Sequence, residues 1–228
     1  MAAMIHPRHE AAGRHIRRSR VAFVPALALL ASCASTEFEA RPSIPPPLVV
    51  RIPVVVGVHG PVEFREKVYK EKRPGVTYSI AIGQGQTDGF MRLMTAMFTR
   101  VVPVSSADAG ARTDPEIRAV FEPVLEDFAF VTPADSGAAM YAVSLRYRIN
   151  GYSPQGQLLE SWTFTGYGSE PSAGLPTQGK PALQKATALA LRDAGAKIAT
   201  EFREQAIVRG LLPRESEAAP PATVEPVP

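Results

Sequence analysis

One cysteine, four histidines and a small group of carboxylates are the residues with which this 228-residue chain could do nucleophilic, metal or acid–base chemistry. The cysteine is Cys33, and three histidines (His6, His9 and His15) precede it, so His59 is the only histidine after Cys33. A structural zinc site needs four Cys or His ligands, and a cysteine nucleophile needs a histidine base. The sequence therefore predicts no metal site of this kind, and because it also contains no cofactor motif, we expect no cofactor.

The densest group of carboxylates lies in the segment FEPVLEDF, which contains Glu122, Glu126 and Asp127. A glycosidase-type pair needs two carboxylates that face each other across a substrate in unequal environments. Acids spaced along one predicted strand are more typical of the solvated side of a sheet. His59 follows a valine-rich strand, and the chain has no nucleophile-elbow motif that this histidine could serve. We predict that the chain is not an enzyme.

A glycine-rich segment, GQGQTDG at residues 83–89, lies between a predicted strand and a predicted helix, where phosphate-binding loops are found. It lacks the Gly-Lys-Ser/Thr ending of a P-loop, and its glycines do not have the dinucleotide-binding spacing. We interpret it as a turn that leads into a helix capped by Thr87 or Asp88.

Two arginines, Arg146 and Arg148, alternate with core residues on one predicted strand. Together with Arg51, Arg65 and Lys67 they would form a basic face for lipid phosphates or peptidoglycan acids. The same alternation also describes the solvated side of a sheet, so both interpretations stay open.

An aromatic set on the neighbouring predicted strands is likewise open to two interpretations. It would line an acyl-chain groove or form ordinary core, and its members are Tyr141, Tyr147, Trp162 and Phe164.

The net charge of +3 and the isoelectric point near 9.1 suggest at first a nucleic-acid partner. Five arginines, however, precede residue 21, and the chain after residue 32 carries 20 basic and 21 acidic side chains. We therefore expect no nucleic-acid partner. The basic stretch RHIRRSR precedes ten apolar residues, VAFVPALALL, which are too few to span a bilayer as a helix. This is the layout of a secretory signal.

The apolar run ends in Leu30-Ala31-Ser32-Cys33, which resembles the lipobox of bacterial lipoproteins. The resemblance implies cleavage before Cys33, a diacylglycerol on its sulfur and a third acyl chain on the new amino terminus. Two or three acyl chains hold a protein on a membrane far more firmly than one. Because Ala34 stands where an aspartate would resemble an inner-membrane retention signal, the resemblance favours the outer membrane, with the protein facing the periplasm.

The composition divides the chain into four parts. Residues 1–32 are the predicted signal peptide, and residues 33–47 are a proline-rich tether in extended polyproline geometry. Residues 48–210 are long enough for one domain with its own core, and residues 211–228 are predicted to be a disordered proline-rich tail.

The domain is predicted to be α+β, with a single antiparallel or mixed β-sheet of about six to seven strands and two helices packed mainly on one face. The clearest strand is YAVSLRYRINGY, and Arg73-Pro74-Gly75 predicts a hairpin turn. The longer helix, from about Pro181 to Arg209, is predicted to cover the sheet with one apolar stripe, which consists of Leu183, Leu191, Ala194, Ile198 and Phe202.

In size and element order this body is similar to the small envelope lipoproteins of Gram-negative bacteria, which include the lipopolysaccharide-assembly lipoprotein and the auxiliary lipoproteins of lipid-transport ABC systems. The resemblance implies a non-catalytic periplasmic domain that acts as an interaction or assembly module on an envelope protein partner. The alternative is a carrier that binds a lipid or glycan in an apolar groove. A deep cavity between sheet and long helix would favour the carrier, and a filled core with an exposed sheet edge would favour the module.

Overall fold

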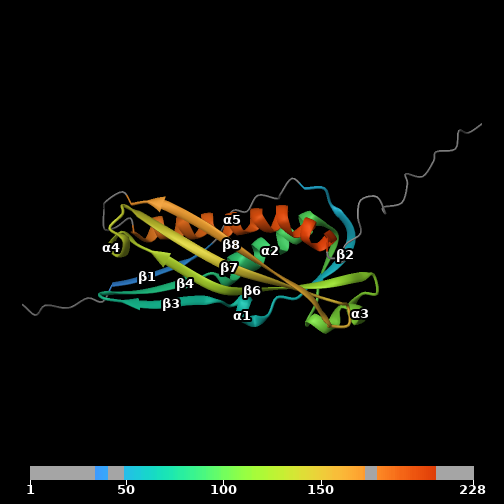
Figure 1. Ribbon diagram of the computed structural model, residues 1–228. Helices are drawn as coiled ribbons and strands as arrows, with labels where there is room; N and C mark the ends of the chain where they lie inside the picture. Colours follow the sequence, from blue (N-terminus) through green and yellow to red (C-terminus); the bar gives the residue numbers. More distant parts are fainter. Residues whose placement is uncertain (1–33, 41–48, 173–178, 209–228) are drawn as a thin grey trace, which may run out of the picture. The chain divides into compact units, whose positions relative to one another are not determined.

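The computed structural model describes residues 34–40, 49–172 and 179–208, with side chains described no further than Phe202. Within these ranges the strands form two sheets (Figure 1). The smaller sheet has the order β1-β4-β3, with bounds Ala34–Glu39, Val76–Ala81 and Val68–Arg73. The larger sheet has the order β5-β2-β6-β7-β8, with bounds Phe98–Pro103, Ile52–Val58, Ile117–Val131, Met140–Tyr152 and Leu158–Pro171.

The same residues contain five α-helices and a 3-10 turn, Ala107–Ala109. Two helices are long, and the other three are single turns. The bounds of α1 to α5 are Val62–Arg65, Gly83–Met97, Gly110–Thr113, Pro133–Ser136 and Gly179–Val208.

The prediction of a single sheet of six to seven strands with two helices is therefore wrong. The predicted hairpin is present, with Gly75 in the left-handed region at φ 75°, but β3 and β4 do not join the larger sheet. β4 pairs with β1 on its other side, and the resulting small sheet packs face-on against β6, where the Tyr69 and Phe128 rings lie 4.6 Å apart between centroids. The helices α1, α3 and α4 were not predicted, because four residues are too few to show helical periodicity.

The larger sheet joins two kinds of pairing. Its strands β5, β2 and β6 are parallel, whereas β6, β7 and β8 form an antiparallel meander. One face of this sheet is covered by α2, by α5 and by the smaller sheet, which together enclose two apolar clusters. Alternation predicts that β7 and β8 each turn one set of residues inward, and most of these residues are buried: Val143, Leu145, Tyr147, Ile149, Trp162 and Phe164. Of the other two predicted inward residues, Tyr141 is half-buried and Leu158, at the start of β8, is exposed.

The long helix α5 lies along β8 and β7, as predicted (Figure 1). Its whole predicted stripe is buried. Two glycines of β8 allow the close approach: a Cβ on Gly168 would lie 2.1 Å from the Ala186 carbonyl oxygen, and one on Gly166 would lie 2.3 Å from that of Ala190. Only glycine leaves room for helix backbone at these positions.

The helix α2 begins earlier than predicted. Its N-cap is Ile82 rather than Thr87 or Asp88, so the glycine-rich segment is part of the helix. Gly83 lies against the backbone between α1 and β3, where its N–H donates to the Lys67 carbonyl and a Cβ would lie 2.2 Å from the Arg65 carbonyl oxygen. This close contact, and not phosphate binding, explains the glycine at position 83.

The strand β1 lies within the segment that was predicted to be a tether. It runs parallel to β4 with Ala34 opposite Val76, so regular pairing starts one residue after Cys33. Cys33 itself, the signal peptide 1–32, residues 41–48 and the tail 211–228 lie outside the described residues. The division into signal, tether, domain and tail stays a prediction.

Candidate functional site

A pocket of about 440 Å³ lies at the carboxyl ends of β2 and β5, where α1 and α2 meet these strands. The carboxyl ends of parallel strands are the usual place for ligands in open α/β sheets. The volume falls within the range of about 300–1,000 Å³ that is typical of small-molecule sites. Its apolar lining consists mainly of Val58, Val62, Phe64, Phe90, Met91 and Val104, and its polar lining includes His59, Arg65, Thr87 and Ser105.

His59 is held in place at the end of β2. Its Nδ1 lies 3.4 Å from the Val104 carbonyl oxygen, and its Nε2 lies 3.7 Å from Glu122 Oε2. Glu122 also accepts hydrogen bonds from Asn150 Nδ2 and the Tyr152 hydroxyl, each at 3.1 Å. Burial, together with the negative charge of Glu122, raises the pKa of Tyr152. Glu122 therefore acts as a support behind the pocket wall.

The predicted carboxylate group does not form an acid–base pair. Glu126 lies between two arginines, 3.4 Å from Arg146 Nε and 3.4 Å from Arg148 Nε, while Glu122 faces His59. A bulge in β6 between Leu125 and Asp127 changes the register between them. Each glutamate thus has its own partners, and they do not flank a common space.

The predicted basic face is only partly assembled. Arg146 and Arg148 lie together on β7, half-exposed, but they share Glu126, which offsets part of their charge. Arg65 belongs to the pocket instead, where its Nε donates to the Gly60 carbonyl at 2.9 Å. Whether Arg146 and Arg148 bind an anion stays a prediction.

Little space remains between the described part of the long helix and the sheet. A cavity of only about 30 Å³ remains between α2, α5 and β7, which is the volume that one water occupies in the liquid. At this cavity the Tyr147 hydroxyl donates to Gln86 Oε1 at 2.8 Å, and Gln86 Nε2 donates to the Phe64 carbonyl at 2.6 Å. Burial raises the pKa of Tyr147. Tyr147, Trp162 and Phe164 are core residues, and Tyr141 is half-buried.

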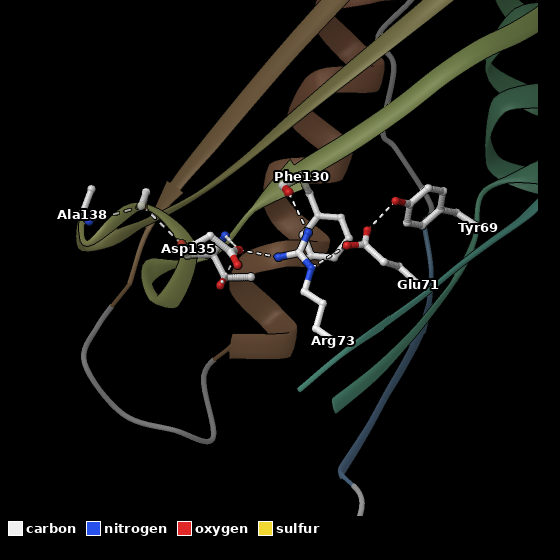
Figure 2. A network of polar contacts seen from close by, with 8 residues as sticks. Tyr69, Glu71, Arg73, Phe130, Asp135 and Ala138 are labelled. Carbon is white, nitrogen blue, oxygen red and sulfur yellow. Dashed lines mark hydrogen bonds and ion pairs between the residues drawn. The ribbon is translucent and has the colours of Figure 1, made fainter. Parts of the chain in front are cut away.

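A second polar cluster, which was not predicted, surrounds Arg73 at the hairpin turn (Figure 2). Arg73 donates through Nε to Glu71 Oε1 at 2.6 Å and through Nη2 to the Phe130 carbonyl at 3.0 Å, and it forms an ion pair with Asp135. Its guanidinium carbon lies 4.1 Å from the centroid of the Phe130 ring. The cluster fastens the smaller sheet to β6 and α4.

The cluster also shifts the pKa values of its members. The hydrogen bond from Arg73 lowers the pKa of Glu71, and backbone hydrogen bonding from Thr132 is the main cause of the lowered pKa of Asp135. Burial and the hydrogen bond to Glu71 raise the pKa of Tyr69 to about 12. The sequence gives little sign of this cluster, because Asp135 lies 62 residues from Arg73.

The described residues lack two features that would point to other kinds of function. They contain no group of three or more His, Cys, Asp or Glu side chains that could hold a metal ion. No helix among them is long and apolar enough to cross a membrane.

No protein-family model and no curated protein sequence matches the chain. Among solved structures, it is similar to a DUF330-family protein of Xanthomonas campestris, with 14% identity and a TM-score of 0.42 over 77% of this chain and 98% of that one. A minor lipoprotein of Acinetobacter baumannii has 11% identity and a TM-score of 0.42 over 68% and 95% of the two chains. The rare lipoprotein B of Shewanella oneidensis has 9% identity and a TM-score of 0.41 over 68% and 97%. Two of these three are bacterial lipoproteins, but at such identities and TM-scores the likenesses assign neither a family nor residue roles to this chain.

Proposed function

We propose that the chain is a non-catalytic lipoprotein of the bacterial envelope, anchored through acyl chains on Cys33 to the outer membrane and facing the periplasm. Its folded part acts as an interaction or assembly module for an envelope protein partner. The observation that carries this proposal is the filled interior. Among the residues that the structure describes, the space between α5 and the larger sheet has room for about one water, which supports the module over an acyl-chain groove in that position.

The surface for a partner is better sought at the pocket than at the edge of β8. On that edge, Asp193 accepts a hydrogen bond from the Tyr167 N–H at 2.9 Å, and Lys197 donates to the Thr165 carbonyl at 2.7 Å. Side chains of α5 thus already form hydrogen bonds with backbone groups of β8 that an added strand would need for pairing. The pocket rim instead presents Val62, whose side chain is half exposed.

The anchor is tested by metabolic labelling with an alkyne-bearing fatty acid. We expect the wild-type protein to take up the label and fractionate with the outer membrane. The Cys33→Ala variant should stay unlabelled. Labelling of that variant at the wild-type level would contradict the anchor.

The module is tested by placing a photo-crosslinking residue at Val62 in living cells, with Val50 as the control because it is also exposed but lies before β2. A protein adduct specific to position 62 is expected. A lipid adduct there would favour the second candidate function, a carrier, for which the 440 Å³ pocket is the supporting observation. Equal crosslinking at both positions would contradict the module and the carrier at this site.

A further inference from the structure

We propose that the pocket at the carboxyl ends of β2 and β5 binds an anionic amphiphile, a single hydrocarbon chain with one carboxylate or phosphate head. This inference rests on the second candidate function, the carrier, and deepens it by naming the class of ligand; it depends on neither the anchor nor a protein partner. It is argued from the size of the pocket, its apolar lining and the charges around it.

The size of the pocket sets the length of the chain. A cavity of about 150 Å³ lined by apolar side chains holds one benzene, which has six carbons. By the same ratio the 440 Å³ of this pocket has room for a chain of up to about 18 carbons.

The lining combines a fixed floor with an adaptable rim. Val58, Phe64 and Phe90 are buried at 5%, 4% and 7% exposure, so the apolar floor is held by the core. Met91 is half-buried and Val62 is exposed on the opposite helix. A methionine thioether adapts readily to irregular apolar partners. The floor favours a hydrocarbon chain, and the rim adjusts to its shape.

The charges at the pocket favour an anion. Arg65 supplies the positive charge of the lining, and no carboxylate is among the lining residues. The His59 imidazole also lines the pocket, and Glu122, outside the lining, lies 3.7 Å from its Nε2. The Arg65 Nε is occupied by the Gly60 carbonyl, which orients the planar guanidinium. Arginine binds carboxylates and phosphates through short, charge-assisted hydrogen bonds. Thr87 contributes no donor, because its hydroxyl already donates to the Gly83 carbonyl at 2.7 Å.

The inner end of the pocket is closed by two aromatic rings. Phe64 and Phe90 meet edge to face, with centroids 6.5 Å apart, and both also line the 30 Å³ cavity beside Tyr147. This pair therefore separates the open pocket from the interior and limits how far a chain can enter.

Binding is tested on the full-length chain carrying Cys33→Ala, so that its own acyl groups do not compete, in detergent-free buffer. A dansyl-labelled undecanoic acid serves as the fluorescent probe, and dodecanoate, dodecyl phosphate and dodecyltrimethylammonium serve as competitors. We expect saturable binding of the probe and displacement by at least one anion, with the cation at least tenfold weaker. Dodecanoate and dodecyl phosphate distinguish a carboxylate head from a phosphate head.

Variants locate the site. Arg65→Gln should weaken the binding of the anion about tenfold or more, since it removes a charge-assisted contact worth about 1.5–3 kcal/mol. Arg51→Gln, at the opposite end of β2, is the matched control and should leave binding unchanged. Val62→Trp fills the pocket from an exposed position and should abolish binding without lowering the melting temperature. Met91→Trp repeats this test from α2.

The proposal is overturned if neither anion competes, if the cation binds as tightly as the anions, or if folded Val62→Trp and Met91→Trp variants keep the wild-type affinity. In the last case the amphiphile binds elsewhere on the chain.

Discussion

At the scale of single residues, Arg73 shows how one side chain joins two sheets. Its guanidinium contacts Glu71 on its own strand, the Phe130 carbonyl on β6 and Asp135 on α4. Asp135 also accepts hydrogen bonds from the Thr132 N–H at 2.7 Å and hydroxyl at 2.8 Å, which makes it the second half of a capping box. The negative charge of Asp135 therefore supports both the α4 turn and the attachment of the hairpin.

This arrangement predicts a pH dependence. The pKa values of Glu71 and Asp135 are lower in the folded protein than in the unfolded chain, where they are near 4.5 and 3.8. The stability that these two carboxylates contribute is therefore fully present above the unfolded values, and it is lost as the pH falls through the lower folded values. The melting temperature should therefore rise between pH 2 and pH 5. In Asp135→Asn this rise should be smaller, and the two proteins should differ least at pH 2. Thermal melts followed by circular dichroism measure this. Asp88→Asn, on the exposed side of α2, is the control, and an identical loss in that variant would show that the effect is one of general surface charge.

The most consequential single side chain of the core is predicted to be Phe202. It is fully buried and meets the rings of Trp162 and Phe121 at centroid distances of 4.9 and 5.1 Å. Phe202→Ala should cost about 3–5 kcal/mol of unfolding free energy, as for other buried aromatic residues. The adjacent exposed residue is the control, and Glu201→Ala should stay within about 0.5 kcal/mol. Denaturant melts compare them. A Phe202→Ala protein as stable as Glu201→Ala would show that the stripe is not part of the core.

At the scale of elements, the sequence was most informative about which face of a strand or helix is buried. The alternation of apolar residues along strands and their helical spacing along helices predicted these faces. The inward face of β7 and the stripe of α5 are as expected. The pairing of strands was not predictable, because the alternation of apolar residues shows which face of a strand is buried but not which strand lies next to it. The missed strand β1 has the sequence ASTEFE, which is short and polar and takes its stability from pairing with β4.

The candidate site was harder to predict than the fold, because it also depends on which strands lie side by side. His59 and Arg65 were both noted in the sequence, the first as a histidine after a valine-rich strand and the second as part of a basic face. They lie six residues apart, but the pocket that they line is completed by Pro103, Val104 and Ser105 at the end of β5, which is 40 or more residues further along and returns beside β2. A pocket formed by the ends of several elements has no local pattern that would reveal it.

The contact between α5 and β8 gives a prediction at this scale. Replacing a strand glycine by alanine usually favours the strand, because glycine loses more conformational freedom on folding. At Gly168 the new Cβ would lie 2.1 Å from the Ala186 carbonyl oxygen and 2.4 Å from the Ala190 nitrogen, so the helix must move. Gly168→Ala should therefore cost about 1–3 kcal/mol, as for overpacked cores. Gly60→Ala is the control, since its nearest neighbour is a flexible Arg65 atom at 3.4 Å. Urea melts distinguish the two, and a stabilised Gly168→Ala would contradict the close packing.

At the scale of the whole molecule, the position of β1 relates the proposed anchor to the proposed site. Cys33 is bonded to Ala34, which lies opposite Val76 beside the hairpin turn. The strand β4 then runs to Ala81, which is opposite Val68, and α1 and the pocket lie beyond that end. Five steps at about 3.3 Å each place the pocket end about 17 Å further along the strand than Ala34, the residue after the anchor. The turn should face the membrane surface, and the pocket should face the periplasm.

This orientation can be measured because acylation of Cys33 would leave no other thiol in the chain. A fluorophore is attached to Lys72→Cys, on β3 beside the turn, or to Glu63→Cys, on α1 at the pocket end; both positions are exposed. On vesicles that carry a quencher in their head groups, the label at position 72 should be quenched strongly and the label at position 63 weakly. The matched comparison uses each labelled chain with Cys33→Ala, in which both labels should remain bright because the protein is no longer held at the surface.

Equal, weak quenching of both labels in the acylated protein would mean that residues 33–47 act as a free tether, as their prolines suggest, and that β1 does not hold the domain beside its anchor. Strong quenching at position 63 alone would reverse the orientation and place the pocket against the lipid, where an amphiphile could enter it directly from the membrane.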